Sequence, residues 1–121
     1  MKGMLRPLTV TPASSLMGTE PHADVRMVLN DYSFTFAPAL RAGRRIIRVE
    51  NVAAQPHEVL IVRPAPGKTV EDMRRWVERP QGPPPIEPVG GAMGLTRGSV
   101  NFVTADFAPG DYALACYVPD A

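Results

Sequence analysis

Two residues of types that bind metals or act as nucleophiles lie at the ends of apolar stretches. Cys116 is the only cysteine, and alternation predicts that Tyr112, Leu114 and Cys116 share one face of a strand. His57 stands at the start of a second predicted strand, just before the apolar run of residues 59–62. A thiolate and an imidazole are two of the three strong ligands of a mononuclear copper site. We therefore predict that the fold brings these two side chains together.

The spacing around both residues resembles a known family. The motif Asn-x5-His at residues 51–57 precedes one strand, and Gly-x-Tyr-x3-Cys at residues 110–116 lies far downstream. Together they resemble the cupredoxins, small blue-copper β-sandwich proteins, over residues 24–121. A closer resemblance, to secreted bacterial cupredoxin-like proteins with a helical insertion, is carried by segments 56–59, 65–69 and 116–120. The resemblance implies copper binding, one-electron transfer with a redox partner protein, and a periplasmic or extracellular location.

The chain matches the ligand set implied by this resemblance only in part. His57 and Cys116 would be equatorial ligands, and Met4 lies in a segment similar to the family's axial-methionine region. No histidine follows Cys116, where the family has its second histidine. His22 is the only other histidine; it lies in a predicted linker and matches no ligand position of the family.

The first eleven residues resemble the final strand of a cupredoxin rather than its beginning. Two explanations stay open: the domain is circularly permuted, or the chain is cut from a tandem protein. In either case we expect residues 5–10 to pair beside the cysteine strand, since that strand would otherwise be an exposed apolar edge. The pairing segment would come from the same chain or from a neighbour, giving a monomer or a strand-swapped homodimer.

The elements that position His57 and Cys116 are expected to be mostly strands. Fourteen prolines and ten glycines among 121 residues indicate many turns, as in all-β folds. We predict a single domain over residues 1–121, an all-β Greek-key sandwich of cupredoxin type with one inserted α-helix. Its predicted parts are a strand at 1–11, a linker at 12–23, a main body at 24–121, extended chain at 81–88 and a flexible loop at 90–98.

One segment departs from the strand pattern. Val70, Met73 and Trp76 recur at helical spacing, and Thr69 is a good N-cap residue before them. This predicts an inserted helix over residues 69–79 that packs on the sheet through these three apolar side chains.

Composition and motifs disfavour several other classes of function. A net charge of +1 does not favour a nucleic-acid partner, and no apolar run is long enough to span a membrane. Without a phosphate-binding loop or a Ser–His–Asp pattern we do not expect an enzyme, and a nucleophilic pair of Cys116 and His57 lacks an identified orienting residue. The rival to copper binding is a cupredoxin-shaped binding or structural module that holds no metal.

Overall fold

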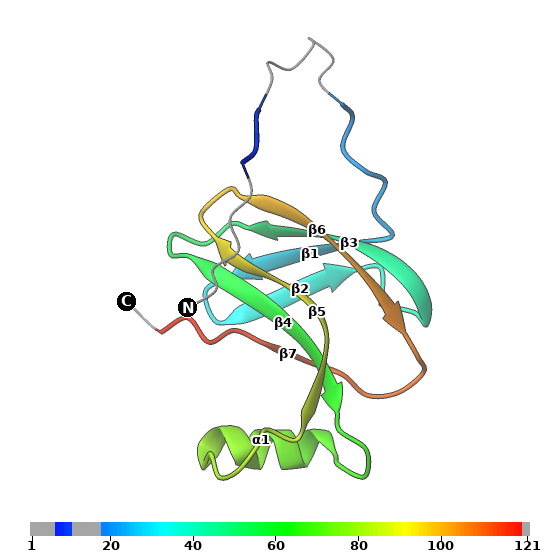
Figure 1. Cartoon of the computed structure of the whole chain (residues 1–121), viewed down its shortest axis with the longest axis vertical. Coiled ribbons are helices and arrows are strands. Elements are labelled where there is room, and N and C mark those ends of the chain that lie inside the picture. The colour runs from blue at the N-terminus through cyan, green and yellow to red at the C-terminus, as the bar shows by residue number, and fades with distance from the viewer. Residues whose placement is uncertain (1–6, 11–17, 120–121) are drawn as a thin grey trace.

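The structure is a computed structural model that describes residues 7–10 and 18–119 (Figure 1). In chain order its elements are β1 (Val25–Asn30), β2 (Ser33–Ala37), β3 (Gly43–Asn51), β4 (His57–Pro64), α1 (Val70–Glu78), β5 (Ile86–Leu95), β6 (Val100–Phe107) and β7 (Ala113–Ala115). Within these described ranges no helix has the length and apolar character needed to cross a membrane.

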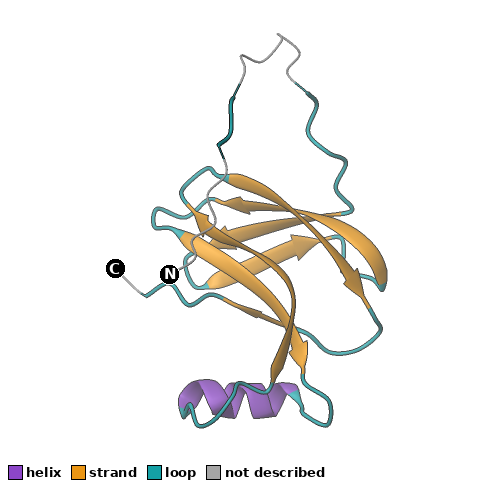
Figure 2. Cartoon of the chain, in the orientation of Figure 1, coloured by secondary structure: helices purple, strands orange, loops and turns teal. Residues whose placement is uncertain are grey.

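The strands form two sheets (Figure 2). The first has the order β2-β1-β3-β6, in which β1 and β3 run parallel, and the second has the order β5-β4-β7, with all pairs antiparallel. Apolar side chains of both sheets meet in one core, which includes Leu29, Ile47 and Val49 from the first sheet and Val59 and Ile61 from the second. The prediction of an all-β protein with one inserted helix is confirmed at this level.

Strand β4 is buried on both faces, as its continuous apolar run predicts. Ile61 belongs to the core between the sheets and has no exposed surface. Val62 points the other way and is also buried, at the base of a groove that Met73 and Trp76 of α1 line with it. Helix α1 lies at the end of the second sheet, between the end of β4 and the start of β5 (Figure 1).

Residues 86–95 form β5, where the sequence predicted extended chain followed by a flexible loop. That prediction was wrong because the strand is defined by its pairing with β4 rather than by its own residue types. Gly91 shows the constraint: a Cβ atom there would lie 2.4 Å from the carbonyl oxygen of Val59. In the sequence, glycine indicates a loop. Here it is required because β5 approaches β4 too closely to leave room for a side chain.

The strand predicted at the N-terminus is not found in the part that the structure describes. Residues 7–10 carry no strand, and Leu8 and Val10 are 86% and 84% exposed. Pro7 has no N–H to donate to a neighbouring strand, which weakens pairing of so short a segment. Pairing of residues 7–10 beside β7 within one chain is therefore wrong, and pairing with a neighbouring chain stays a prediction. Met4 and the rest of residues 1–6 lie outside the described residues.

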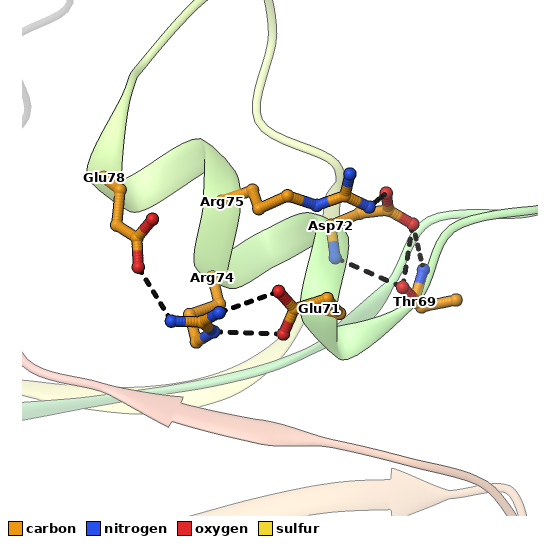
Figure 3. Close-up of polar contacts among 6 residues, drawn as sticks. All are labelled: Thr69, Glu71, Asp72, Arg74, Arg75 and Glu78. Carbon is orange, nitrogen blue, oxygen red and sulfur yellow. Dashed lines mark hydrogen bonds and ion pairs between the residues drawn. The ribbon is translucent and has the colours of Figure 1, made fainter.

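Helix α1 begins and ends as predicted, with Thr69 as N-cap (Figure 3). The Thr69 hydroxyl accepts a hydrogen bond from the backbone N–H of Asp72 at 3.1 Å, and the Asp72 carboxylate accepts one from the Thr69 N–H at 2.8 Å. Arg74 pairs with both Glu71 and Glu78 along the exposed side. Such exposed ion pairs contribute little, so the reciprocal cap and the packed face stabilise the helix.

The packed face of α1 is narrower than the helical spacing predicts. Met73 is 7% exposed, whereas Val70 is 40% exposed and Trp76 is half-buried. The indole N–H of Trp76 donates to the carbonyl of Gly82 at 3.2 Å. Met73 is thus the apolar anchor, and Trp76 mainly ties the helix to the segment that follows it.

We expect Met73→Ala to lower the free energy of unfolding by about 2 kcal/mol, near the lower end for a buried methionine. The matched control is Val77→Ala on the same helix, where the side chain is 58% exposed and the expected change is below about 0.5 kcal/mol. Equilibrium unfolding in urea measures both variants. Equal, small effects would show that the helix does not pack on β4.

Candidate functional site

The structure brings His57 and Cys116 together, 59 residues apart in the chain. The Cys116 sulfur lies 3.7 Å from Nδ1 of His57. His57 is the first residue of β4, and Cys116 directly follows the last residue of β7. Because β4 and β7 are antiparallel neighbours, with Leu60 opposite Ala115, the start of one meets the end of the other. The predicted juxtaposition at neighbouring strand ends is therefore found.

Asn51 holds the loop that delivers His57 to its position. Its side chain is fully buried; the amide N–H groups donate to the carbonyls of Gln55 (2.9 Å) and Leu95 (2.8 Å), and its oxygen accepts from the N–H of Ala53 (2.9 Å). These three bonds close residues 51–55 into a compact turn and attach it to the end of β5. Asn51 entered the sequence analysis only as part of a spacing motif, and its buried hydrogen bonds explain that spacing.

Asp31 is the site residue that the sequence analysis missed. Its carboxylate oxygen Oδ1 lies 3.1 Å from Nε2 of His57, on the side of the ring opposite Cys116. It belongs to the turn between β1 and β2, which lies in the other sheet, so no spacing in the sequence connects it to His57. A carboxylate at Nε2 favours the N–H there, and a neutral His57 then presents its Nδ1 lone pair to the sulfur.

The sulfur of Cys116 receives hydrogen bonds from the backbone, and it also receives one from the imidazole when His57 is protonated at Nδ1. Backbone N–H groups of Glu58 and Val118 are directed at it. The Glu58 carboxylate in turn accepts the backbone N–H of Tyr117 at 3.1 Å, which fastens the chain beyond Cys116 to β4. The sulfur therefore sits in a short cradle built from the first residues of β4 and the residues after β7.

These contacts shift both titrations. Burial acts to raise the pKa of the Cys116 thiol, but the N–H of Glu58, the His57 side chain and the N–H of Val118 together outweigh burial and lower that pKa. The pKa of His57 is raised, first by its hydrogen bond to Cys116 and then by Asp31, against the opposing effect of burial. Both shifts favour the charged pair, a thiolate beside an imidazolium.

The pair opens onto a cavity of about 290 Å³. Its walls come from the β1–β2 hairpin, through Leu29, Tyr32 and Phe34, and from Gln55 in the turn held by Asn51. Space for a bound ion or small molecule therefore lies directly against the sulfur and the imidazole.

The other candidate ligands are not part of this arrangement. His22 is exposed and precedes β1. The six residues of β1, roughly 20 Å of chain, separate His22 from the turn that contains Asp31. Met4 lies outside the described residues. Over residues 7–10 and 18–119, no group of three or more His, Cys, Asp and Glu side chains is arranged to hold a metal ion. Of the ligands implied by the resemblance, only His57 and Cys116 lie together among the described residues.

Comparison of the chain with protein-family models, with curated proteins and with solved structures finds no match. The functional argument for this protein therefore depends on its own residues and their geometry.

We expect the thiolate absorbance of Cys116 to titrate below the usual range of a free thiol. Asp31→Asn removes the charge that favours imidazolium, so the midpoint should move upward, while Asp111→Asn in an exposed turn serves as control. Because the folded pKa of the thiol lies below the unfolded one, its ionisation stabilises the fold above the unfolded pKa, and this contribution disappears as the pH falls through the folded value. An unchanged midpoint in Asp31→Asn would contradict the coupling.

Proposed function

We propose that the protein binds copper through the thiolate of Cys116 and Nδ1 of His57. The observation that carries this proposal is the 3.7 Å separation of the two donor atoms at the edge of a cavity. A soft thiolate with an imidazole is a donor set that suits copper, whereas oxygen donors suit magnesium or calcium.

The separation of the donor atoms fits a shared metal ion. Metal bonds of about 2.0 Å to an imidazole nitrogen and about 2.3 Å to a thiolate sulfur, with 3.7 Å between the two atoms, correspond to a bond angle of about 120°. That angle is the trigonal one expected of copper held by nitrogen and sulfur ligands. Bound copper would supply a centre that can accept and release one electron.

The chain's own groups prepare the two donors for this role. Asp31 accepts from Nε2 of His57, which orients the ring and leaves Nδ1 free to donate a lone pair to the ion. The N–H groups of Glu58 and Val118 stabilise negative charge on the Cys116 sulfur, so the thiolate persists at lower pH. These contacts favour metal binding without themselves contributing a metal ligand.

The sequence resemblance extends the proposal to the fold and the setting. We assign the two sheets to a Greek-key sandwich of cupredoxin type; an Asn–His loop before β4, a cysteine after β7 and a helix inserted after β4 support this assignment. With it come one-electron transfer to a redox partner protein or copper handling, a periplasmic or extracellular location, and Met4 as an additional sulfur donor. A monomer and a strand-swapped dimer both remain compatible with the proposal.

Copper(I) suits the described residues better than copper(II). A thiolate and one imidazole satisfy the low coordination and soft-ligand preference of copper(I). A blue copper(II) centre needs a third strong ligand in the trigonal plane, and the described residues contribute two. Copper handling is therefore the better supported of the two roles.

We expect the protein to retain one equivalent of copper(I) in anaerobic competition with a chromophoric chelator. Cys116→Ser should abolish retention and His57→Gln should weaken it, while Tyr117→Phe, which alters a neighbour but no donor, should behave as the parent protein. Copper(II) should produce no intense blue absorption. An intense blue colour would require a third strong ligand, with His22 the first to test, and failure to retain copper(I) would favour the metal-free binding module.

A second candidate is nucleophilic chemistry at Cys116. Asp31, His57 and Cys116 form a line in which a carboxylate orients an imidazole beside a thiol, the arrangement used by thiol hydrolases. Asp31 is the orienting residue that the sequence did not reveal. The test is incubation with an activated aryl ester: a burst of one equivalent of the released phenol, lost in Cys116→Ser, would support this candidate. We expect no burst, since copper binding explains the same contacts.

A further inference from the structure

The backbone of Tyr32 is unusual among the described residues. Tyr32 is the one non-glycine residue there with a positive φ, 60°, which lies in the left-handed region. It occupies the second central position of the turn between Asn30 and Ser33, where β1 and β2 pair. Glycine or asparagine adopts this conformation with less strain than a residue with a bulky side chain.

Burial does not account for a tyrosine at this position. Tyr32 is 78% exposed, so burial of its ring in the core does not offset the strained backbone. Its neighbour Phe34, by contrast, packs against the core from the adjoining strand. Strained conformations that packing does not explain are concentrated at functional sites.

The position of Tyr32 connects it to the candidate site. It lines the cavity that contains Cys116 and His57, and it also lines a neighbouring surface depression together with Asp31 and Gln55. Asp31, the preceding residue, contacts His57 directly. Tyr32 therefore lies where the cavity meets the outer surface, on the same turn that orients the imidazole.

We propose that Tyr32 is a specificity-determining residue that controls access to the Cys116–His57 pair. Its ring narrows the mouth of the cavity, so that small soft cations and small thiol reagents reach the sulfur while bulky aromatic chelators and disulfides are excluded. For copper, this inference rests on the proposed function. For access to the thiol it does not, because the same mouth controls any reagent that approaches Cys116.

Two substitutions separate the ring from the turn. Tyr32→Asn removes the ring but accepts the left-handed conformation, which preserves the turn and the contact between Asp31 and His57. Tyr32→Phe keeps the ring and the strain and loses only the hydroxyl. We expect the Asn variant to melt a few degrees higher than the parent protein, because backbone strain is relieved, and the Phe variant to be unchanged.

The test is the rate at which the metal-free protein reacts with a small methyl thiosulfonate and with a bulky aromatic disulfide. The parent protein and Tyr32→Phe should react several-fold faster with the small reagent, after correction for each reagent's rate with free cysteine. Tyr32→Asn should lose this size preference through faster reaction with the bulky reagent. If the corrected ratio is the same in all three proteins, or if Tyr32→Asn accelerates both reagents equally, Tyr32 does not control access.

A second measurement keeps this proposal distinct from copper binding. In the copper(I)-loaded protein, a bulky aromatic chelator should remove the ion several-fold faster from Tyr32→Asn than from Tyr32→Phe, while cyanide should remove it equally fast from both. Size-selective thiol reaction in a protein that retains no copper would overturn the metal proposal and support the access role. Copper retention without any size preference would overturn the access role alone.

Discussion

The antiparallel pairing of β4 with β7 is the constraint on which the candidate site depends. Register in a sheet is set by backbone hydrogen bonds, so placing Leu60 opposite Ala115 also brings the start of β4 next to the residues after β7. His57 and Cys116 occupy those positions, and Glu58 reaches across to the N–H of Tyr117. A slip of one residue would turn the side chains of the shifted strand to the opposite face and separate the thiol from the imidazole.

The polar groups around the site stabilise a thiolate on Cys116, which is half-buried. A thiolate there is unfavourable unless donors surround it, and the N–H groups of Glu58 and Val118 are fixed by the backbone itself. The carboxylate of Asp31 reaches His57 from the opposite sheet. The protonation of His57 therefore depends on how the two sheets pack together. The three buried hydrogen bonds of the Asn51 side chain hold the loop before His57 in place.

The hairpin between β1 and β2 combines two roles in adjacent residues. Asp31 faces inward to His57, while Tyr32 is exposed and adopts a positive φ. Strain at one residue of a turn is tolerated when the flanking strands pair well, and β1 pairs with β2 on one side and with β3 on the other. A strongly paired strand can therefore present a strained turn at the edge of a cavity without loss of the fold.

Local patterns in the sequence determined the elements whose residues carry their own signal. The apolar run of residues 59–62 located β4, and alternation located the strand that carries Leu114. The cap at Thr69 with helical spacing located α1, because propensity and periodicity act within a few residues. Motif spacing likewise predicted the meeting of His57 with Cys116. Tertiary structure alone decided the rest: β5 exists because β4 pairs with it, residues 7–10 stay outside the sheets, Met73 rather than Trp76 anchors the helix, and Asp31 reaches His57. The reason is physical, since contacts between residues distant in the chain depend on strand order and sheet facing, and no local spacing in the chain encodes either.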